Sequence, residues 1–284
     1  MAGRFDIRDR ILRLDPKADC QEIVLLVGAY EYPWLIRKSL EFALFRSYGA
    51  PRISQLLDQT GQFKRHGQRR VDDTGLLLAE IVENGYDSPR GRQAIKMINR
   101  MHGKFDIAND DMLYVLSTFV FEPIYWTQRF SWRRPSHHEN LANYHFWAEV
   151  GARMAIKNIP PTIEEFEGFK QDYERERFRY EASNRRVADA TLQVLQNWYP
   201  KPLRPIVRQV VYAMLDEPLR RAFGYPKPLP LMRLAVHGSL LLAAKLLRFL
   251  PPRREPFLLT RAAHRSYPDG YQLDNLGPPD ITSG

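Results

Sequence analysis

Apolar residues recur at helical spacing in almost every patterned segment of this chain, and this periodicity limits the folds that it can adopt. Strict apolar–polar alternation between Asn-Gly or Asp-Gly turns, which is typical of β-hairpins, is absent. The sequence therefore predicts an all-α fold. The simplest organisation is an N-terminal extension over residues 1–20, one multi-helix domain over residues 21–250 and a tail over residues 251–284. The tail is rich in Pro, Arg, Asp and Gly, and we expect it to be extended or partly disordered.

Capping residues mark the starts of three expected helices. Ser88 precedes Pro89, so a helix should start there and run to His102, with Gly103 as its stop. Capping boxes over residues 136–139 and 162–165 should open two more helices, which end near residues 154 and 180. Further helices are expected over residues 76–82, 112–121 (ended near Pro123), 205–219 and 231–250.

Composition excludes several classes of protein. The formal net charge is +9 at pH 7, but the densest basic runs are only pairs, such as Arg69-Arg70 and Arg133-Arg134. Because no zinc-finger, RRM or basic-zipper pattern accompanies these pairs, we expect no nucleic-acid partner. Cys20 is the only cysteine, which excludes an internal disulfide framework, a four-cysteine zinc site and an iron–sulfur cluster held by this chain alone.

Two segments bear on where the protein is located. Residues 1–10 lack the apolar stretch of a signal peptide, and we expect a cytoplasmic protein. No segment reaches the about 18–20 uninterrupted apolar residues of a membrane span. The apolar segment 229–250 is broken by Arg233, His237, Lys245 and Arg248. It could lie on a membrane surface or be an ordinary buried helix.

His102 is the most informative of the seven histidines. It shares one helix face with Ala94, Ile95, Ile98 and Met101, so its imidazole should lie in the interior and need a partner there. That partner could be a backbone carbonyl, as for many core histidines, or a metal ion. A di-iron bundle is not indicated, because no histidine has a glutamate three residues before it. Motifs for His-Glu-x-x-His zinc sites, serine nucleophiles and nucleotide cofactors are also absent.

Arg70 and Thr74 form a second candidate site. They are four residues apart and so share one helix face, just before the apolar run 76–82. A guanidinium and a hydroxyl in that position suit an anionic or peroxidic group, for example the carboxylate of a cofactor. They could equally be structural, with Arg70 paired to Asp72 or Asp73 and Thr74 bonded back to its own turn.

The order of these segments resembles the rubber-oxygenase (latex-clearing protein) and MpaB oxygenase superfamily. The resemblance is carried by Arg70-x-x-x-Thr74, an apolar helix, a Gly-Tyr-Asp-Ser-Pro turn and Ile98-Asn-Arg-Met-His102. Residues 107–116, 132–139 and 147–156 are also similar to the family's pattern, so that the likeness covers about residues 23–200.

The resemblance implies a globin-related, all-α fold that encloses a b-type haem, and the lack of a Cys-x-x-Cys-His motif means that this haem is bound non-covalently. It implies that His102 is the protein ligand to the iron, that Arg70 and Thr74 bind the haem and take part in catalysis, and that Arg100 is a further haem-binding residue. Rubber-cleaving members carry a lysine where this chain has Asp73, which argues against rubber as the substrate.

The activity that the resemblance implies is that of a haem-dependent oxygenase, an oxidoreductase. It would use O2 to oxidise or cleave a carbon–carbon double bond of a hydrophobic, isoprenoid-like substrate. Two other functions fit the same residues. A haem-binding sensor or carrier would use His102 without turnover, and a cofactor-free helical interaction protein would keep His102 as a core residue. O2 and a hydrophobic small molecule are the expected partners, with segment 229–250 as a candidate for peripheral membrane contact.

Overall fold

The computed structural model describes residues 3–278, which form thirteen α-helices and no β-strand. The prediction of an all-α fold is therefore confirmed for this part of the chain. The α-helices are α1 (Asp6–Ile11), α2 (Cys20–Leu26), α3 (Pro33–Ser47), α4 (Pro51–Thr60), α5 (Gln62–Asn84), α6 (Pro89–His102), α7 (Asn109–Phe130), α8 (His137–Arg153), α9 (Ile163–Arg177), α10 (Ala182–Asn197), α11 (Arg204–Met214), α12 (Glu217–Ala222) and α13 (Pro230–Leu247). A π-helical turn, η1 (Val27–Glu31), and three 3-10 turns, η2 (Lys201–Leu203), η3 (Leu259–Arg261) and η4 (Leu273–Asn275), complete the elements.

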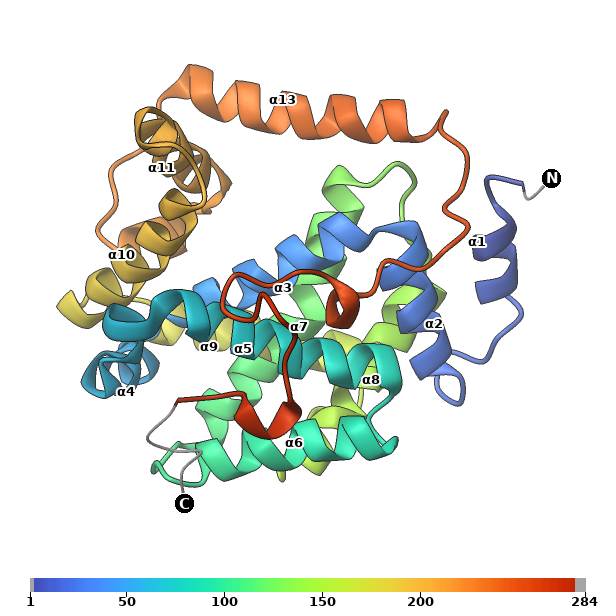
Figure 1. Ribbon diagram of the computed structural model, residues 1–284, viewed down its shortest axis with the longest axis horizontal. Helices are drawn as coiled ribbons and strands as arrows, with labels where there is room; N and C mark the ends of the chain where they lie inside the picture. Colours follow the sequence, from blue (N-terminus) through green and yellow to red (C-terminus); the bar gives the residue numbers. More distant parts are fainter. Residues whose placement is uncertain (1–2, 279–284) are drawn as a thin grey trace.

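The helices pack in pairs around α3 and α7, which lie side by side at the centre of the molecule (Figure 1). α5 pairs with α6, and α2 pairs with α8. α4, α10 and α11 gather at one end, and α13 runs along the edge of the molecule, attached mainly to α11. The chain after α13 then returns across α5 towards α6, as the red trace in Figure 1 shows.

The predicted caps are present. The Ser88 side chain accepts a hydrogen bond from the backbone N–H of Gly91 at 2.9 Å, and α6 ends at His102, as predicted. Ser136 and Glu139 form the expected reciprocal capping box at the start of α8. The cap at residues 162–165 also opens a helix, but α9 ends at Arg177 and so stops short of the predicted end.

Pro123 does not end its helix, which corrects the expected end of that element. α7 runs through this proline to Phe130. An interior proline costs a helix about 3 kcal/mol, because it removes a backbone hydrogen bond and crowds the preceding turn. The side chains on both sides of Pro123 are buried, among them Phe121, Ile124 and Trp126, and their packing outweighs this cost.

The helix expected over residues 205–219 is in fact two helices. α11 ends at Met214, and the Asp216 side chain starts α12 by accepting a hydrogen bond from the backbone N–H of Leu219 at 3.0 Å. An aspartate that accepts from the N–H three residues later is a strong N-cap, so a new helix begins where the periodicity alone predicted a continuous one.

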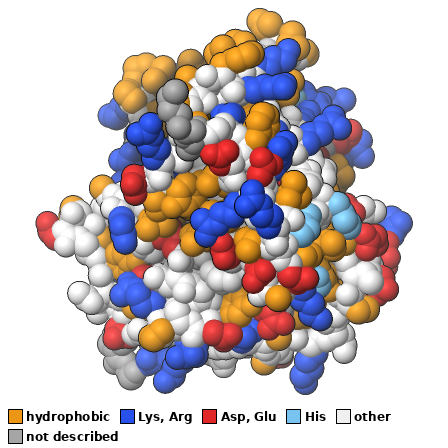
Figure 2. Space-filling view, turned by 90° about the vertical axis from the view of Figure 1, so that its right-hand side faces the viewer, with side chains coloured by type: hydrophobic (Ala, Val, Ile, Leu, Met, Phe, Trp, Pro, Cys, Tyr) orange, Lys and Arg blue, Asp and Glu red, His pale blue; other side chains and the backbone are white. Residues whose placement is uncertain are grey.

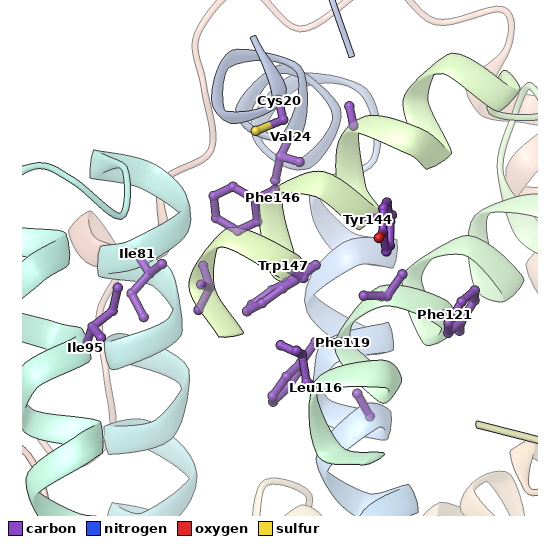
Figure 3. Packing of buried hydrophobic residues seen from close by; sticks show 14 of the residues in the cluster. Cys20, Val24, Ile81, Ile95, Leu116, Phe119, Phe121, Tyr144, Phe146 and Trp147 are labelled. Carbon is purple, nitrogen blue, oxygen red and sulfur yellow. The ribbon is translucent and has the colours of Figure 1, made fainter. Parts of the chain in front are cut away.

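The largest hydrophobic core lies between α2, α5, α6, α7 and α8. In Figure 3, Phe119 and Trp147 lie close together beside Leu116, and their rings stack at a centroid distance of 5.0 Å. The N-terminal extension also contributes to this core, because Ile11 of α1 is fully buried in it. A second core cluster, built mainly from α3, α10, α11 and α12, lies at the other end of the molecule.

The tail is extended, as predicted, but over residues 251–278 it is anchored along α5. Acidic residues of α5 accept its hydrogen bonds: Asp72 from the Ser266 backbone, Asp73 from the Tyr267 hydroxyl, Glu80 from the Tyr271 hydroxyl and Glu83 from the Leu259 backbone. Leu273 and Leu276 add buried apolar contacts. Residues 251–278 therefore follow the extended alternative of the prediction, held on α5 by these contacts, and residues 279–284 lie outside the described part.

We expect Tyr267→Phe to lower the free energy of unfolding by about 1–2 kcal/mol, because it leaves the buried Asp73 carboxylate without its phenol donor. Urea denaturation of the purified chain measures this change, and limited proteolysis should cut the tail faster. Tyr199→Phe is the matched control, because Tyr199 is 48% exposed. Equal effects of the two changes would contradict a tail held by Asp73.

Candidate functional site

A large, mainly apolar cavity of about 870 Å³ lies between α3, α5, α6, α7 and the tail. This volume is near the upper end of the range of about 300–1,000 Å³ that ligand and cofactor sites occupy. Figure 3 shows Ile81 of α5 on one side and Trp147, Phe119 and Leu116 on the other, and all four residues line this cavity. The cavity is thus an extension of the main core that side chains do not fill.

His102 lines the cavity at the last residue of α6. Burial, together with the positive charge of Arg70, lowers the pKa of its imidazole to about 4, so the ring is neutral at pH 7. The buried Nδ1 atom has no hydrogen-bond partner among the residues that the structure describes. A core histidine kept only for packing would have found a backbone carbonyl, and this Nδ1 has none. An imidazole of this kind is suited to binding a ligand.

Arg70 lines the same cavity from α5. Within residues 3–278, no carboxylate lies within ion-pair distance of its guanidinium, which is 5.8 Å above the ring of Phe63. Burial lowers the pKa of Arg70, with partial compensation from Tyr48 and Asp73. Arg70 is therefore not a surface arginine paired with Asp72 or Asp73, which was the structural alternative. A partly buried cation without a counter-ion is a natural site for an anionic group.

Thr74 and Arg100 differ from this pair. Thr74 lines the cavity, but its hydroxyl donates to the backbone oxygen of Arg70 at 2.9 Å. This is the hydrogen bond within its own helical turn that the sequence offered as the structural alternative. A catalytic role for Thr74 stays a prediction. Arg100 is exposed and is not among the residues that line the cavity. A haem-binding role for Arg100 therefore stays a prediction that the cavity does not support.

The sequence missed two contributors to the cavity wall. Tyr48 is a buried residue near Arg70, and burial raises the pKa of its phenol to about 12. The tail adds a second wall, with Phe257, Leu259 and His264 among its lining residues. Neither carries a local signal, because Tyr48 follows the end of α3 without any motif and the tail has no periodicity.

The residues of the cavity suit haem better than a metal ion bound by side chains alone. Among residues 3–278 there is no group of three or more His, Cys, Asp and Glu side chains that could hold a metal ion. One imidazole holds iron well only when another molecule supplies the remaining ligands, as a porphyrin does. The cavity offers a neutral imidazole with an unpartnered nitrogen, an arginine free to meet a carboxylate and an apolar wall. These residues fit a haem.

His102 should make the stability of the apoprotein depend on pH. Its pKa is about 6.5 when the chain is unfolded and about 4 when it is folded, so the unfolded state binds more protons between these values. The contribution of His102 is complete above pH 6.5 and is lost as the pH falls towards 4, with a total on the order of 3 kcal/mol.

We therefore expect the free energy of unfolding of the wild type to fall more steeply than that of His102→Ala between pH 7 and pH 4.5. Urea denaturation of both at several pH values measures the difference. His66→Ala, a change at an exposed histidine, should follow the wild type. Parallel curves for wild type and His102→Ala would refute a neutral, buried His102.

Comparison with known proteins shows the family of the chain. The family model described as "ER-bound oxygenase mpaB/B'/Rubber oxygenase, catalytic domain" matches residues 42–249, which include the cavity-lining parts of α5 and α6. An "ER-bound oxygenase mpaB'" of Penicillium brevicompactum is 35% identical over 79% of this chain and 57% of its own length. An "ER-bound oxygenase mpaB" of Penicillium roqueforti is 33% identical over 69% of this chain and 72% of its own length.

The match to the first of these relatives is partial, since this chain spans little more than half of its length. The names of these relatives describe ER-bound proteins. The sequence predicted a cytoplasmic protein with a candidate membrane contact, and of these two expectations only the membrane contact agrees with the names of the relatives. The family model covers well over half of the chain, and the relatives exceed 30% identity. The chain therefore belongs to the MpaB/rubber-oxygenase catalytic-domain family.

Proposed function

We propose that this protein is a haem-dependent oxygenase that uses O2 to oxidise or cleave a carbon–carbon double bond of a hydrophobic, isoprenoid-like substrate. The observation that carries the proposal is the neutral imidazole of His102, a residue that lines a large apolar cavity and whose Nδ1 has no hydrogen-bond partner among the described residues. Family membership supports the same reaction class, because the curated relatives are named oxygenases.

His102 and Arg70 would hold the cofactor. The neutral imidazole of His102 would be available to bind the iron at pH 7, since its proton is lost well below that pH. Arg70 would pair with a carboxylate of the cofactor and so gain a counter-ion that residues 3–278 do not supply. When bound, haem iron supplies the activation of O2 that an alkene oxidation requires.

The remaining wall of the cavity would bind and orient the substrate. Leu116, Phe119 and Trp147 offer apolar surface on one side, and the tail residues Phe257 and Leu259 offer it on the other. An alkene chain has no polar group to bond, so a wall of this composition binds it by excluding water. The tail thus has two roles in this proposal: it stabilises α5 and it completes the pocket.

The test is O2 uptake by the haem-loaded protein with a prenylated compound, compared with the same compound after its double bonds have been reduced. We expect O2 consumption and carbonyl products with the unsaturated chain, and neither with the saturated one. A haem-loaded protein that turns over no alkene would favour the sensor or carrier. A protein that binds no haem would favour the cofactor-free interaction protein.

A further inference from the structure

α13 is a helix without a partner on most of its surface. Of its eighteen residues only Ala244 is buried, and by length and composition it is apolar enough to cross a membrane. The expectation of an ordinary buried helix for this segment is therefore wrong. In Figure 1 α13 runs along the edge of the molecule, apart from the central helices. A helix as rich in leucine as this one is usually buried in a protein core or in lipid, and most of α13 is not in the core.

The two sides of α13 have different roles. One stripe faces the protein, where Leu240 packs against the cluster around Trp126 and Phe130, and His237 bonds the backbone oxygen of Ala213 at 3.2 Å. The opposite side carries Leu231 and Leu234, which are 78% and 71% exposed. Leu241, Leu242, Leu246, Leu247, Phe249 and Leu250 continue this exposed apolar surface. The inner stripe fixes the helix on the body and leaves the outer side uncovered.

The charges around α13 all have one sign. Between residues 226 and 254 there are six basic residues and no acidic residue: Lys227, Arg233, Lys245, Arg248, Arg253 and Arg254. Figure 2 shows apolar side chains along the top of the molecule, where α13 lies, with Lys and Arg side chains next to them. A basic, apolar helix is complementary to a bilayer that contains anionic lipid.

We infer that α13 lies in the plane of an anionic membrane, with its outer side in the interface and the basic residues at the lipid headgroups. This inference is independent of the proposed oxygenase activity. A second copy of this chain is a poorer partner, because a two-fold contact would place the same six basic residues of each copy against each other.

The connections of α13 favour a helix in the plane over one that crosses the bilayer. Eighteen residues span about 27 Å, so a crossing helix would place residues 229 and 251 on opposite sides of the membrane. Both ends instead return to the same folded body. Before α13, the chain forms α11, which packs against α13. After α13, the backbone N–H of Phe257 donates to the backbone oxygen of Ala29 at 2.9 Å. Val211 and Phe257 also line the cavity, so docking would bring one wall of the cavity next to the lipid.

Vesicle flotation of the purified full chain tests this inference. We expect binding to phosphatidylcholine vesicles that contain phosphatidylserine, weaker binding to phosphatidylcholine alone, and loss of binding at high salt. Leu234→Glu should lower the partition coefficient by about tenfold, and Lys245→Gln and Arg248→Gln by about fivefold each. Tyr180→Glu is the matched control, since Tyr180 is 58% exposed but lies after α9.

Two further measurements complete the test. The outer residues make few contacts within the fold, so Leu234→Glu should keep the circular dichroism and the melting temperature of the wild type. A tryptophan placed by Leu242→Trp should be quenched by lipids labelled near the headgroup more than by lipids labelled at the bilayer centre. Wild-type protein that does not float, or Leu234→Glu that floats equally well, would overturn the inference. So would a wild-type dimer that Leu234→Glu converts to a monomer, because α13 would then be an interface between copies.

Discussion

Replacement of His102 by alanine is expected to remove haem binding and oxygenase activity while the fold remains. The imidazole is the side chain in the cavity that would hold the iron, and without it the affinity for haem should fall at least about 100-fold. The fold should tolerate the change, because Nδ1 of His102 makes no hydrogen bond that would be lost. Titration with haemin, followed by the Soret band, measures the affinity, and added imidazole should restore part of it.

His264→Ala is the matched control for this experiment. His264 also lines the cavity, but its Nε2 atom is already bonded to the backbone oxygen of Leu259 at 2.8 Å. We expect this variant to bind haem with nearly the affinity of the wild type, and its tail to be less stable. If His264→Ala lost the haem and His102→Ala kept it, the residue that binds the iron would lie in the tail, and His102 of α6 would not be that residue.

Arg70→Met is expected to change stability and haem affinity in opposite directions. The partly buried guanidinium has no counter-ion in the described chain, so an apolar side chain of similar size should stabilise the apoprotein by about 1 kcal/mol. The same change removes the proposed partner of a haem carboxylate. A charge-assisted hydrogen bond of this kind accounts for a factor of about 10–100 in affinity. Urea denaturation without haem and haemin titration measure the two effects.

The neighbouring Arg69→Met provides the comparison. Arg69 donates to the backbone oxygen of Asn275 at 3.0 Å and lies 3.8 Å from Asp73, so its loss should loosen the tail and lower stability. Its effect on haem affinity should be small. An Arg70→Met apoprotein that is less stable than the wild type would show that Arg70 has a structural partner. Unchanged haem affinity would show that it does not bind the cofactor.

The sequence predicted those features that depend on neighbouring residues. The caps at Ser88 and Ser136 depend on side chains three residues apart, and helix periodicity placed His102 on the inner face of α6. The order of short motifs then singled out Arg70 and His102, which the fold brings to one cavity. In each case the information lies within about one or two helical turns or in the order of segments along the chain.

The features that the sequence did not predict depend on contacts between distant segments. Pro123 stays helical only because α7 is buried on both sides of it, which no local pattern shows. The tail is ordered because acids of α5 accept hydrogen bonds from residues almost two hundred positions later, such as Tyr267. That contact also gives Asp73 a role, because its carboxylate binds the tail that forms one wall of the cavity.

The absorption spectrum and the iron content of the purified wild-type protein test most directly whether this fold binds one haem through His102. We expect a Soret band and about one iron per chain, since the cavity is lined by His102, whose Nδ1 has no hydrogen-bond partner among the described residues. Colourless protein without iron that gains no Soret band on addition of haemin would contradict it. In that case His102 would be a structural residue of an apolar cavity that binds something else.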